Sequence, residues 1–575
     1  MPMLPLVHPA LVLLAAAPLV AMLRGYARRA VLLAAPLLAI AGALGLPTGH
    51  HGVVELAGQT LVLVRVDPLS QLFGLIFTAI AFIGAVYALH VDRGGEQIAT
   101  LVYAAGGLGV VYAGDWITAF VGLELMGVAS LLIVWFGASV RARMAGFRYI
   151  FVHLTAGALV FAGIALLWTS GTGLSLDPLA ADAGLGYGLV LGGVLINAAV
   201  PPVHAWLTDA YPEASVTGTI FLSAFTTKTA IYLLIRVFPG VEALAWVGAI
   251  MAVYGAVFAV LENDIRRLLA YHIVSQVGYM VAGVGIGTAL AINGTAAHAF
   301  SHILYKALLL MGAGAVLQAT GRRKLTELGG LARSMPVVTT LYLIGACSIS
   351  GVPLFNGFVS KSMIVSAASE HGLAGVEWLL TVASVATFLH TGLKLPYFTF
   401  FGPDRGLAPV KLPGNMIAAM TLAALACIGI GIVPGWLYAR LPLTPVDYLP
   451  YTADHLFSTV QLLVGTAAAF LLMRGGLGGK ATVTLDTDRL WRRPVWNAVR
   501  GLARGTARAG HAWRVGVNTA LTGVTDVLQS PFHLATPAAP PYDADRHRLP
   551  IGATVVWIVV GIVGLVLAIW RLTGV

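Results

Sequence analysis

The sequence is poor in charged residues and in cysteine. Of its 575 residues only 10% are charged, while 58% are hydrophobic and the mean hydropathy is +0.87. Soluble domains carry about 25% charged residues, so a soluble globular protein is excluded. The two cysteines, Cys347 and Cys427, both lie in apolar stretches. We therefore expect neither a disulfide framework nor a thiolate metal site.

Several signals of other protein classes are also missing. The glycine-rich stretch 475–480 lacks the spacing of a phosphate-binding loop and follows no predicted strand, which argues against nucleotide binding. The chain carries no cofactor motif, so we expect no cofactor and no redox centre of its own. No charged residues precede the first apolar run, which therefore predicts a spanning helix and not a signal peptide. The net charge of +10 would suggest nucleic acid in a soluble chain, but in a membrane protein its distribution matters more.

What the sequence does contain is long apolar runs. They predict an all-α polytopic membrane protein with about sixteen transmembrane helices. The predicted spans cover residues 8–23, 30–46, 69–90, 98–113, 116–136, 148–168, 186–207, 216–237, 244–261, 268–289, 295–318, 336–369, 379–401, 415–433, 457–474 and 551–572. The span 336–369 is too long for one straight crossing, so we expect it to be broken near Pro353.

The loops between these spans alternate in charge. One set is basic and contains Arg24, Arg28, Arg29, Arg141, Arg143, Arg148, Arg266, Arg267, Arg322, Arg323, Lys324, Arg333, Arg405, Lys411 and the tail after Arg474. The other set holds Glu55, Asp177, Asp182, Glu242, Glu370 and Glu377, with Arg65 and Arg440 as its main cations. Basic loops face the cytoplasm, so both termini are predicted to lie outside it.

Two predicted spans contain helix-breaking residues. Pro201 and Pro202 interrupt the seventh span, and Pro353 lies between two glycines in the twelfth. Proline removes a backbone donor, and irregular backbone is tolerated at membrane depth only where protein buries it or where it lines a cavity. Breaks in corresponding positions of two halves indicate inverted repeats with a transport path at their interface. The simpler alternative is a pair of ordinary proline kinks.

Ionisable residues recur inside the predicted spans. They are Glu124, Lys228, His298, His302, Lys306 and Lys394. The second histidine and Lys306 each follow the preceding member by four residues, so three of the six share one helix face. A charge at the bilayer centre costs about 2.5–3.5 kcal/mol, so a chain that retains six such groups is expected to use them for proton transfer. The alternative is a set of structural charges, with Lys306 reaching the interface.

Each of these groups needs a partner at membrane depth. Lys228 is the best available partner for Glu124, since an unpaired carboxylate there would be neutralised. We expect His153 and His272 to be structural. Lys361 follows the second break, and we expect it to support the backbone there instead of carrying protons.

Five stretches resemble motifs of the antiporter-like subunit family. They are 123–126, 202–210, 264–279, 298–307 and 357–361, and the resemblance runs from about residue 60 to 435. This family includes the A-type and D-type subunits of Mrp cation/proton antiporters, the large proton-pumping membrane subunits of respiratory complex I and subunits of membrane-bound hydrogenases. The resemblance implies two inverted five-helix repeats, each with a broken helix, and a central hydrophilic axis. It matches the family's essential glutamate to Glu124, its connecting residues to His298, His302 and Lys306, and its terminal lysine to Lys394.

The chain departs from this family at one position. Family members commonly carry a lysine where this chain has Asn197, so Lys228 takes over the pairing or the first half-channel is altered. The stretch 225–228, Lys394 and the stretch 485–488 resemble most closely the D-type antiporter subunits.

The resemblance and the composition together divide the chain. We expect N-terminal helices at 1–95, a first repeat at 96–240, a second repeat at 241–405 and additional helices at 406–475. A basic segment at 476–550 and a final transmembrane helix at 551–575 follow. Arginines in the basic segment alternate with Trp and aliphatic residues, which predicts an amphipathic helix that binds anionic lipid on the cytoplasmic surface. The alternative is a solvated basic loop.

The resemblance implies a proton-translocating subunit of a multisubunit monovalent cation (Na⁺ or K⁺)/H⁺ antiporter, similar to the D-type Mrp subunits, in a bacterial plasma (inner) membrane. Its partners would be other membrane subunits, protons and the cation, and not nucleic acid. One alternative is the same module in a complex I-like NADH-quinone oxidoreductase or a membrane-bound hydrogenase. Another is the membrane partner of a bicarbonate or CO₂ uptake complex.

Overall fold

The computed structural model describes residues 8–56, 58–478, 486, 489, 494, 496–529 and 555–564. In the first half the elements are α1 (Pro9–Met22), α2 (Gly25–Gly45), β1 (Gly49–Leu56), β2 (Gln59–Val66), α3 (Pro68–Ala88), α4 (Gly94–Tyr112), α5 (Trp116–Trp135), α6 (Val140–Thr169), α7 (Gly184–Asn197), α8 (Ala205–Ala210), α9 (Gly218–Ala224) and α10 (Thr226–Val237). Short 3₁₀ turns cover Ala181–Ala183 and Tyr211–Glu213.

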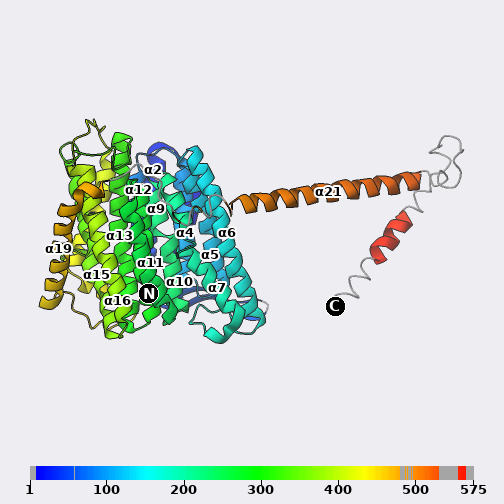
Figure 1. Ribbon diagram of the computed structural model, residues 1–575. Coiled ribbons are helices and arrows are strands. Elements are labelled where there is room, and N and C mark those ends of the chain that lie inside the picture. The colour runs from blue at the N-terminus through cyan, green and yellow to red at the C-terminus, as the bar shows by residue number, and fades with distance from the viewer. Residues whose placement is uncertain are drawn as a thin grey trace. The chain divides into compact units, whose positions relative to one another are not determined.

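The second half continues the bundle. Its elements are α11 (Glu242–Leu261), α12 (Ile265–Ile286), α13 (Ala289–Thr320), α14 (Pro336–Ser350), α15 (Asn356–Glu370), α16 (Ala374–Thr387), two π-helical segments (Phe388–Lys394 and Tyr397–Phe401), α17 (Gly414–Ile432), α18 (Gly435–Tyr438), α19 (Ala453–Leu477) and α21 (Trp496–Gln529). In Figure 1, α4 to α7 lie at one end of the bundle, α15 and α19 lie at the other, and α10 to α13 lie between them.

The helices confirm the all-α polytopic membrane fold. Among the described residues, 11 helices are long and apolar enough to cross a membrane, and shorter apolar helices include Pro9–Met22, Pro336–Ser350 and Val555–Gly564. Each predicted span overlaps a described helix or a pair of helices. The windows of α12 and of Gly218–Val237 are entirely buried, whereas only 11% of the α19 window is. The polar axis of the protein is therefore to be sought around α10, α12 and α13.

Polar residues at the helix starts set the helix boundaries. Asp67 accepts a hydrogen bond from the Ser70 amide in a capping box at α3, and Asp115 accepts one from the Thr118 amide at α5. Asp264 accepts from the amides of Arg266 and Arg267 at the start of α12. These side chains satisfy amides that have no partner within the helix.

One element was not expected from the sequence. Residues 49–66 fall in a predicted loop, but β1 and β2 form an antiparallel hairpin with Gly49 opposite Val66 and Leu56 opposite Gln59. Val53 pairs with Val62 within it. Valine favours strands because its branched side chain fits the pleated surface.

Both predicted helix breaks are present. The first separates α7 from α8 at residues 198–204, and the second separates α14 from α15 at residues 351–355. Each falls in the fourth helix of its predicted repeat, as the two-repeat arrangement requires. Trp206 Nε1 donates to the carbonyl of Ile196 at 3.0 Å, so a side chain satisfies a carbonyl beside the first break.

The predicted span 379–401 is not an ordinary helix. After α16 the backbone becomes π-helical over Phe388–Lys394 and again over Tyr397–Phe401. Pro396 lies between the two segments and has no amide to donate. Single π-helical turns are rare and occur mostly at functional sites.

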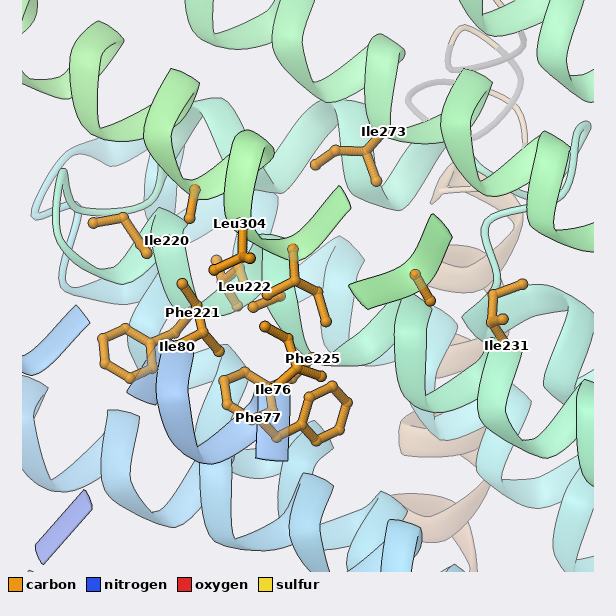
Figure 2. Packing of buried hydrophobic residues seen from close by; sticks show 14 of the residues in the cluster. Ile76, Phe77, Ile80, Ile220, Phe221, Leu222, Phe225, Ile231, Ile273 and Leu304 are labelled. Carbon is orange, nitrogen blue, oxygen red and sulfur yellow. The ribbon is translucent and has the colours of Figure 1, made fainter. Parts of the chain in front are cut away.

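The core packs tightly where the halves meet. Figure 2 shows Phe77 of α3 together with Phe221 and Phe225 at the end of α9, close to Leu304 of α13. The ring centroids of Phe77 and Phe225 are 4.7 Å apart. A side chain at Gly84 would place its Cβ only 2.7 Å from the Phe221 ring, so glycine permits this close approach.

Residues 490–575 form a second compact unit. Its helix α21 carries Arg500, Arg504 and Arg508 at four-residue steps on one face, and the expected amphipathic helix is thus present. Leu502, Trp513 and Val524 are all exposed on that helix. The expected residues Trp491, Arg492 and Arg493 lie outside the described residues, as do both ends of the predicted last span.

Candidate functional site

The expected line of ionisable groups on α13 is fully buried. His298, His302 and Lys306 are each 0% exposed, and the two imidazole centroids are 6.3 Å apart. His298 Nδ1 lies 3.3 Å from Ser360 Oγ. Neither ring nitrogen of His302 has a hydrogen-bond partner within the described part of the chain. The three groups occupy one face of a helix at the centre of the bundle, as their spacing predicted.

One branch leaves this line towards the basic loops. Lys306 Nζ lies 3.5 Å from His272 Nδ1, and the rings of His272 and His390 are 4.9 Å apart. Lys394 follows His390 by four residues in the π-helical segment and donates to the carbonyl of Glu262 at 3.1 Å. The branch thus ends at the α11–α12 connection, beside the basic residues that begin α12.

His272 and His390 were missed as members of this line. We expected His272 to be structural, yet its ring lies between Lys306 and the His390 ring, with Nε2 3.1 Å from Thr387 Oγ1. A buried histidine on a fully buried helix was the available sequence signal. Its position next to Lys306 depends on the packing of α12 against α13.

A second branch leads from His298 to Lys361. Ser360, which contacts His298, directly precedes Lys361 on α15. Lys361 Nζ lies 5.6 Å from the centre of the Tyr279 ring and has no hydrogen-bond partner among the described atoms. It is near Gly351 at the second break, but it donates to no carbonyl there. The expected role in supporting the backbone is thus not apparent in its contacts.

Lys361 lines a cavity of about 280 Å³ between α15, α16 and α19. Hydroxyl groups dominate its polar lining, with Ser362, Ser384 and Thr459 contributed by three different helices. Glu377, from the set of loops predicted to lie outside the cytoplasm, also lines it. The cavity therefore offers water a polar route from Lys361 towards that side.

Lys228 does not pair with Glu124 in this structure. It is 0% exposed on α10 and donates to the Ser223 carbonyl at 2.7 Å and to Thr227 Oγ1 at 3.1 Å. Within the described residues no ion pair or hydrogen bond joins it to Glu124. Its charge instead acts on His302 and Lys306. Lys228 thus belongs to the second-half line in this conformation.

Glu124 lies on α5 in a different environment. It lines a small cavity of about 30 Å³ with His153 of α6 and Asn197 at the end of α7. His153 Nδ1 is 2.9 Å from Asn197 Oδ1. A Cβ on Gly157 would collide with Glu124 Oε1, so the carboxylate reaches this cavity across a glycine.

A cluster of hydroxyl groups lies beside this first site, on the way to α10. Tyr149 stacks on the His153 ring at 4.2 Å and donates to Ser130 Oγ at 2.9 Å. Tyr103 OH lies 2.5 Å from Thr226 Oγ1, two residues before Lys228. These groups provide polar atoms between Glu124 and Lys228 in an otherwise apolar interior.

A carboxylate from far along the chain reaches the first break. Asp486 accepts hydrogen bonds from His204 Nε2 at 3.1 Å, from Tyr271 OH at 2.5 Å and from Tyr254 OH. Its side chain is 1% exposed. The sequence marked the stretch 485–488 only as a resemblance to D-type subunits. The structure shows that its aspartate joins the first break to α11 and α12.

The described residues contain no group of three or more His, Cys, Asp or Glu that could hold a metal ion. The chemistry available at these sites is proton transfer between imidazole, amine, carboxylate and water. The buried line contains two kinds of base and one kind of acid. Their spacing of 3–6 Å suits transfer through single bound waters.

Comparisons with known proteins agree with this architecture. The family described as NADH:quinone oxidoreductase/Mrp antiporter, TM, matches residues 113–390. A probable K(+)/H(+) antiporter protein of Rhizobium meliloti, its A/B component, is 29% identical over 64% of this chain, and the match spans 40% of that protein. An NADH-quinone oxidoreductase subunit N of Desulforudis audaxviator is also 29% identical, over 67% of this chain and 82% of its own length.

Solved structures support the same fold. A chain of the archaeal membrane-bound sulfane sulfur reductase has a TM-score of 0.74 at 21% identity, covering 90% of this chain and 99% of that one. A chain of the Mrp complex from Dietzia sp. has a TM-score of 0.62 at 23% identity, covering 81% of this chain and 93% of that one. Both are subunits of multisubunit membrane complexes.

Proposed function

Because the chain belongs to the family of antiporter-like membrane subunits, we propose that it is the proton-translocating subunit of a larger membrane complex that exchanges protons for Na⁺ or K⁺. Its part in such a complex would resemble that of the D-type Mrp subunits. The observation that carries this proposal is the buried line of Lys306, His272, His390 and Lys394, with His302 and His298 leading the other way. Retaining so many ionisable groups at membrane depth is costly unless they carry ions.

The two branches give the line two ends. Protons would enter at Lys394, beside the basic loop that begins α12, and would reach Lys306 through His390 and His272. They would leave along His302, His298 and Lys361 into the hydroxyl-lined cavity. The roles of Glu124, Lys228, His298, His302, Lys306 and Lys394 in this path are part of the proposal.

Lys228 would control the line electrostatically. While its charge is not neutralised, it disfavours a second positive charge on Lys306 and drives the proton outward. When Glu124 or a proton arriving from it changes the charge balance around Lys228, Lys306 regains its proton. The structure, in which Glu124 and Lys228 are apart, would be the state in which the line has released its proton.

A second function is favoured by one comparison. The Desulforudis protein is matched over 82% of its length, against 40% for the Rhizobium antiporter protein. The same proton path would then serve an oxidoreductase, with all redox centres in partner subunits. The two functions differ in what drives the flux, which makes them separable by experiment.

The test is proton flux in sealed vesicles that contain the native complex. A pH gradient is imposed with and without Na⁺ or K⁺, and flux is followed with a pH-sensitive dye for the parent, Glu124→Gln, Lys306→Met and Lys394→Met. Lys411→Met, an exposed lysine in a basic loop, is the matched control. Flux is normalised to the amount of assembled complex.

We expect cation-dependent flux in the parent and the control, and its loss in the three axis variants. Flux that ignores Na⁺ and K⁺ and requires an electron donor would favour the oxidoreductase function instead. Parental flux in all three variants would contradict the proposed path.

A further inference from the structure

Glu124 has a partner that the sequence did not indicate. Its cavity is lined by two other polar side chains, His153 and Asn197, and no described cation makes an ion pair with it. A carboxylate in an apolar span needs a polar neighbour in either protonation state. The nearest group that can exchange a proton with it is the imidazole of His153.

The His153 ring is held rigidly in place. Its Nδ1 lies 2.9 Å from Asn197 Oδ1, and because an amide oxygen only accepts, Nδ1 carries the proton. The ring lies between two aromatic side chains, Tyr149 at 4.2 Å and Trp206 at 4.6 Å. Asn197 therefore selects the tautomer, and the two aromatic residues select the orientation.

This arrangement leaves Nε2 as a proton acceptor. Nε2 is buried and has no hydrogen-bond partner among the described atoms, and the ring lines the cavity that Glu124 shares. A cavity of about 30 Å³ has room for about one water molecule, which needs polar partners to stay. Glu124 and Nε2 supply such partners on opposite sides of it.

We propose that His153 is the proton-exchange partner of Glu124, so that the two form the first relay of this protein. In the forward step, the O–H bond of protonated Glu124 breaks and its proton passes through the water to Nε2, where an N–H bond forms. The products are a carboxylate and an imidazolium, whose Nδ1–H still donates to Asn197. The return step reverses this transfer, and no other reactant is needed.

The pair has a physical advantage over two separate groups. Before transfer both partners are neutral, which suits an apolar span; after transfer they are oppositely charged neighbours. Each charge then stabilises the other at short range. Asn197 contributes to both states because its oxygen accepts from neutral imidazole and from imidazolium alike. This inference rests on the proposed proton-translocating function.

The experiment exchanges the position of the titratable base. Proton flux is measured in vesicles with the native complex carrying His153→Gln, Asn197→Lys or both changes. A lysine at position 197 enters the same cavity from α7 and can replace the imidazole as the base. His371→Gln, an exposed histidine after α15, is the matched control. Assembled complex is quantified in every vesicle preparation.

We expect His153→Gln to lower flux about 100-fold, the usual size of a general acid–base contribution. The double variant should regain at least a third of the parental flux, although Asn197→Lys alone is impaired. A double variant that assembles but stays at the level of His153→Gln would overturn the proposal, as would parental flux in His153→Gln. Should the double variant not assemble, His153→Lys supplies an amine from α6 and must retain flux for the proposal to stand.

Glu124→Gln separates this inference from the proposed function. Loss of flux in Glu124→Gln together with parental flux in His153→Gln would remove only the partner assignment. Parental flux in Glu124→Gln would remove the proton path as a whole.

Discussion

At the scale of single residues, a glycine determines how Glu124 is placed. Gly157 lies on α6 one turn after His153, and a methyl group there would collide with Glu124 Oε1. Because the contact is with the end of a side chain, the fold can tolerate the methyl group only if the carboxylate moves. Function would then be lost without loss of the bundle.

We predict that Gly157→Ala lowers proton flux about 10- to 100-fold while the complex still assembles, since displacing a reacting group by about 1 Å has effects of this size. Gly127→Ala is the control. Gly127 lines the same cavity from α5, but a Cβ there would meet no atom within 4 Å. Equal flux in both variants would mean that the position of Glu124 does not matter.

The charged residues at the axis also behave as individuals. Lys228, Lys306, Lys361 and Lys394 are all buried, but only Lys394 donates to carbonyls at a helix end. Lys228 donates to a carbonyl and a hydroxyl, and Lys361 has no partner among the described groups. Identical residue types therefore have different local environments, which chain position alone does not reveal.

At the scale of elements, one ion pair joins the start of α3 to the end of α10. Arg236 binds Asp67 through both carboxylate oxygens at 2.5 and 2.7 Å, and Arg65 adds a contact at 3.1 Å. Burial alone would raise the pKa of Asp67. The hydrogen bond and charge of Arg236 outweigh it, and the pKa lies below its ordinary value.

We predict that Asp67→Asn destabilises the folded protein by about 1–3 kcal/mol at neutral pH, because Arg236 loses its charged partner and the α3 cap is weakened. The measure is the thermal midpoint in detergent. Since the folded-state pKa is lowered, the difference from the parent is full above the unfolded value of about 3.9 and fades as pH falls through the lower folded one.

Asp182→Asn is the matched control for this variant. Asp182 is exposed in the connection before α7, on the segment that also carries Asp177. It should leave the midpoint unchanged. A midpoint of Asp67→Asn equal to that of the control would mean that the ion pair adds nothing to stability.

The interrupted helices are the other element-scale device. The breaks and the π-helical segments place polar groups where regular helices would place only apolar ones. Asp486 at the first break and Lys361 after the second are examples. The sequence located both breaks but treated 379–401 as a regular span.

At the scale of the whole molecule, the charges of the loops set the orientation in the membrane. The predicted topology places the β1–β2 hairpin outside the cytoplasm and the loop after the second π-helical segment inside it. The two described ends of α2 and α3 at the hairpin would then face away from the basic loops. This orientation is a prediction from charge alone.

The test uses cysteines on the two sides. Glu55→Cys in the hairpin and Arg405→Cys in the basic loop are both exposed, whereas Cys427 is buried in α17 and Cys347 is partly buried in α14. We predict that a membrane-impermeant maleimide labels Glu55→Cys from outside intact cells and Arg405→Cys only after lysis. The parent, with its native cysteines, reports background labelling. The reverse pattern would invert the topology and the direction of the proposed path.

The sequence by itself determined the membrane class, the helix positions, both breaks and the buried ionisable residues on α5, α10 and α13. Each follows from properties local in the chain: hydropathy, proline placement and the cost of charge in an apolar run. It did not indicate the β1–β2 hairpin, since short alternating strands next to strong apolar runs carry a weak signal.

Only the tertiary structure decided which of these residues are neighbours. It placed His153 and not Lys228 beside Glu124, His272 between Lys306 and His390, and Lys361 at a polar cavity. It also brought Asp486 to the first break. These contacts join helices that are distant in the chain, and they depend on how side chains pack between helices, which no local pattern of residues encodes.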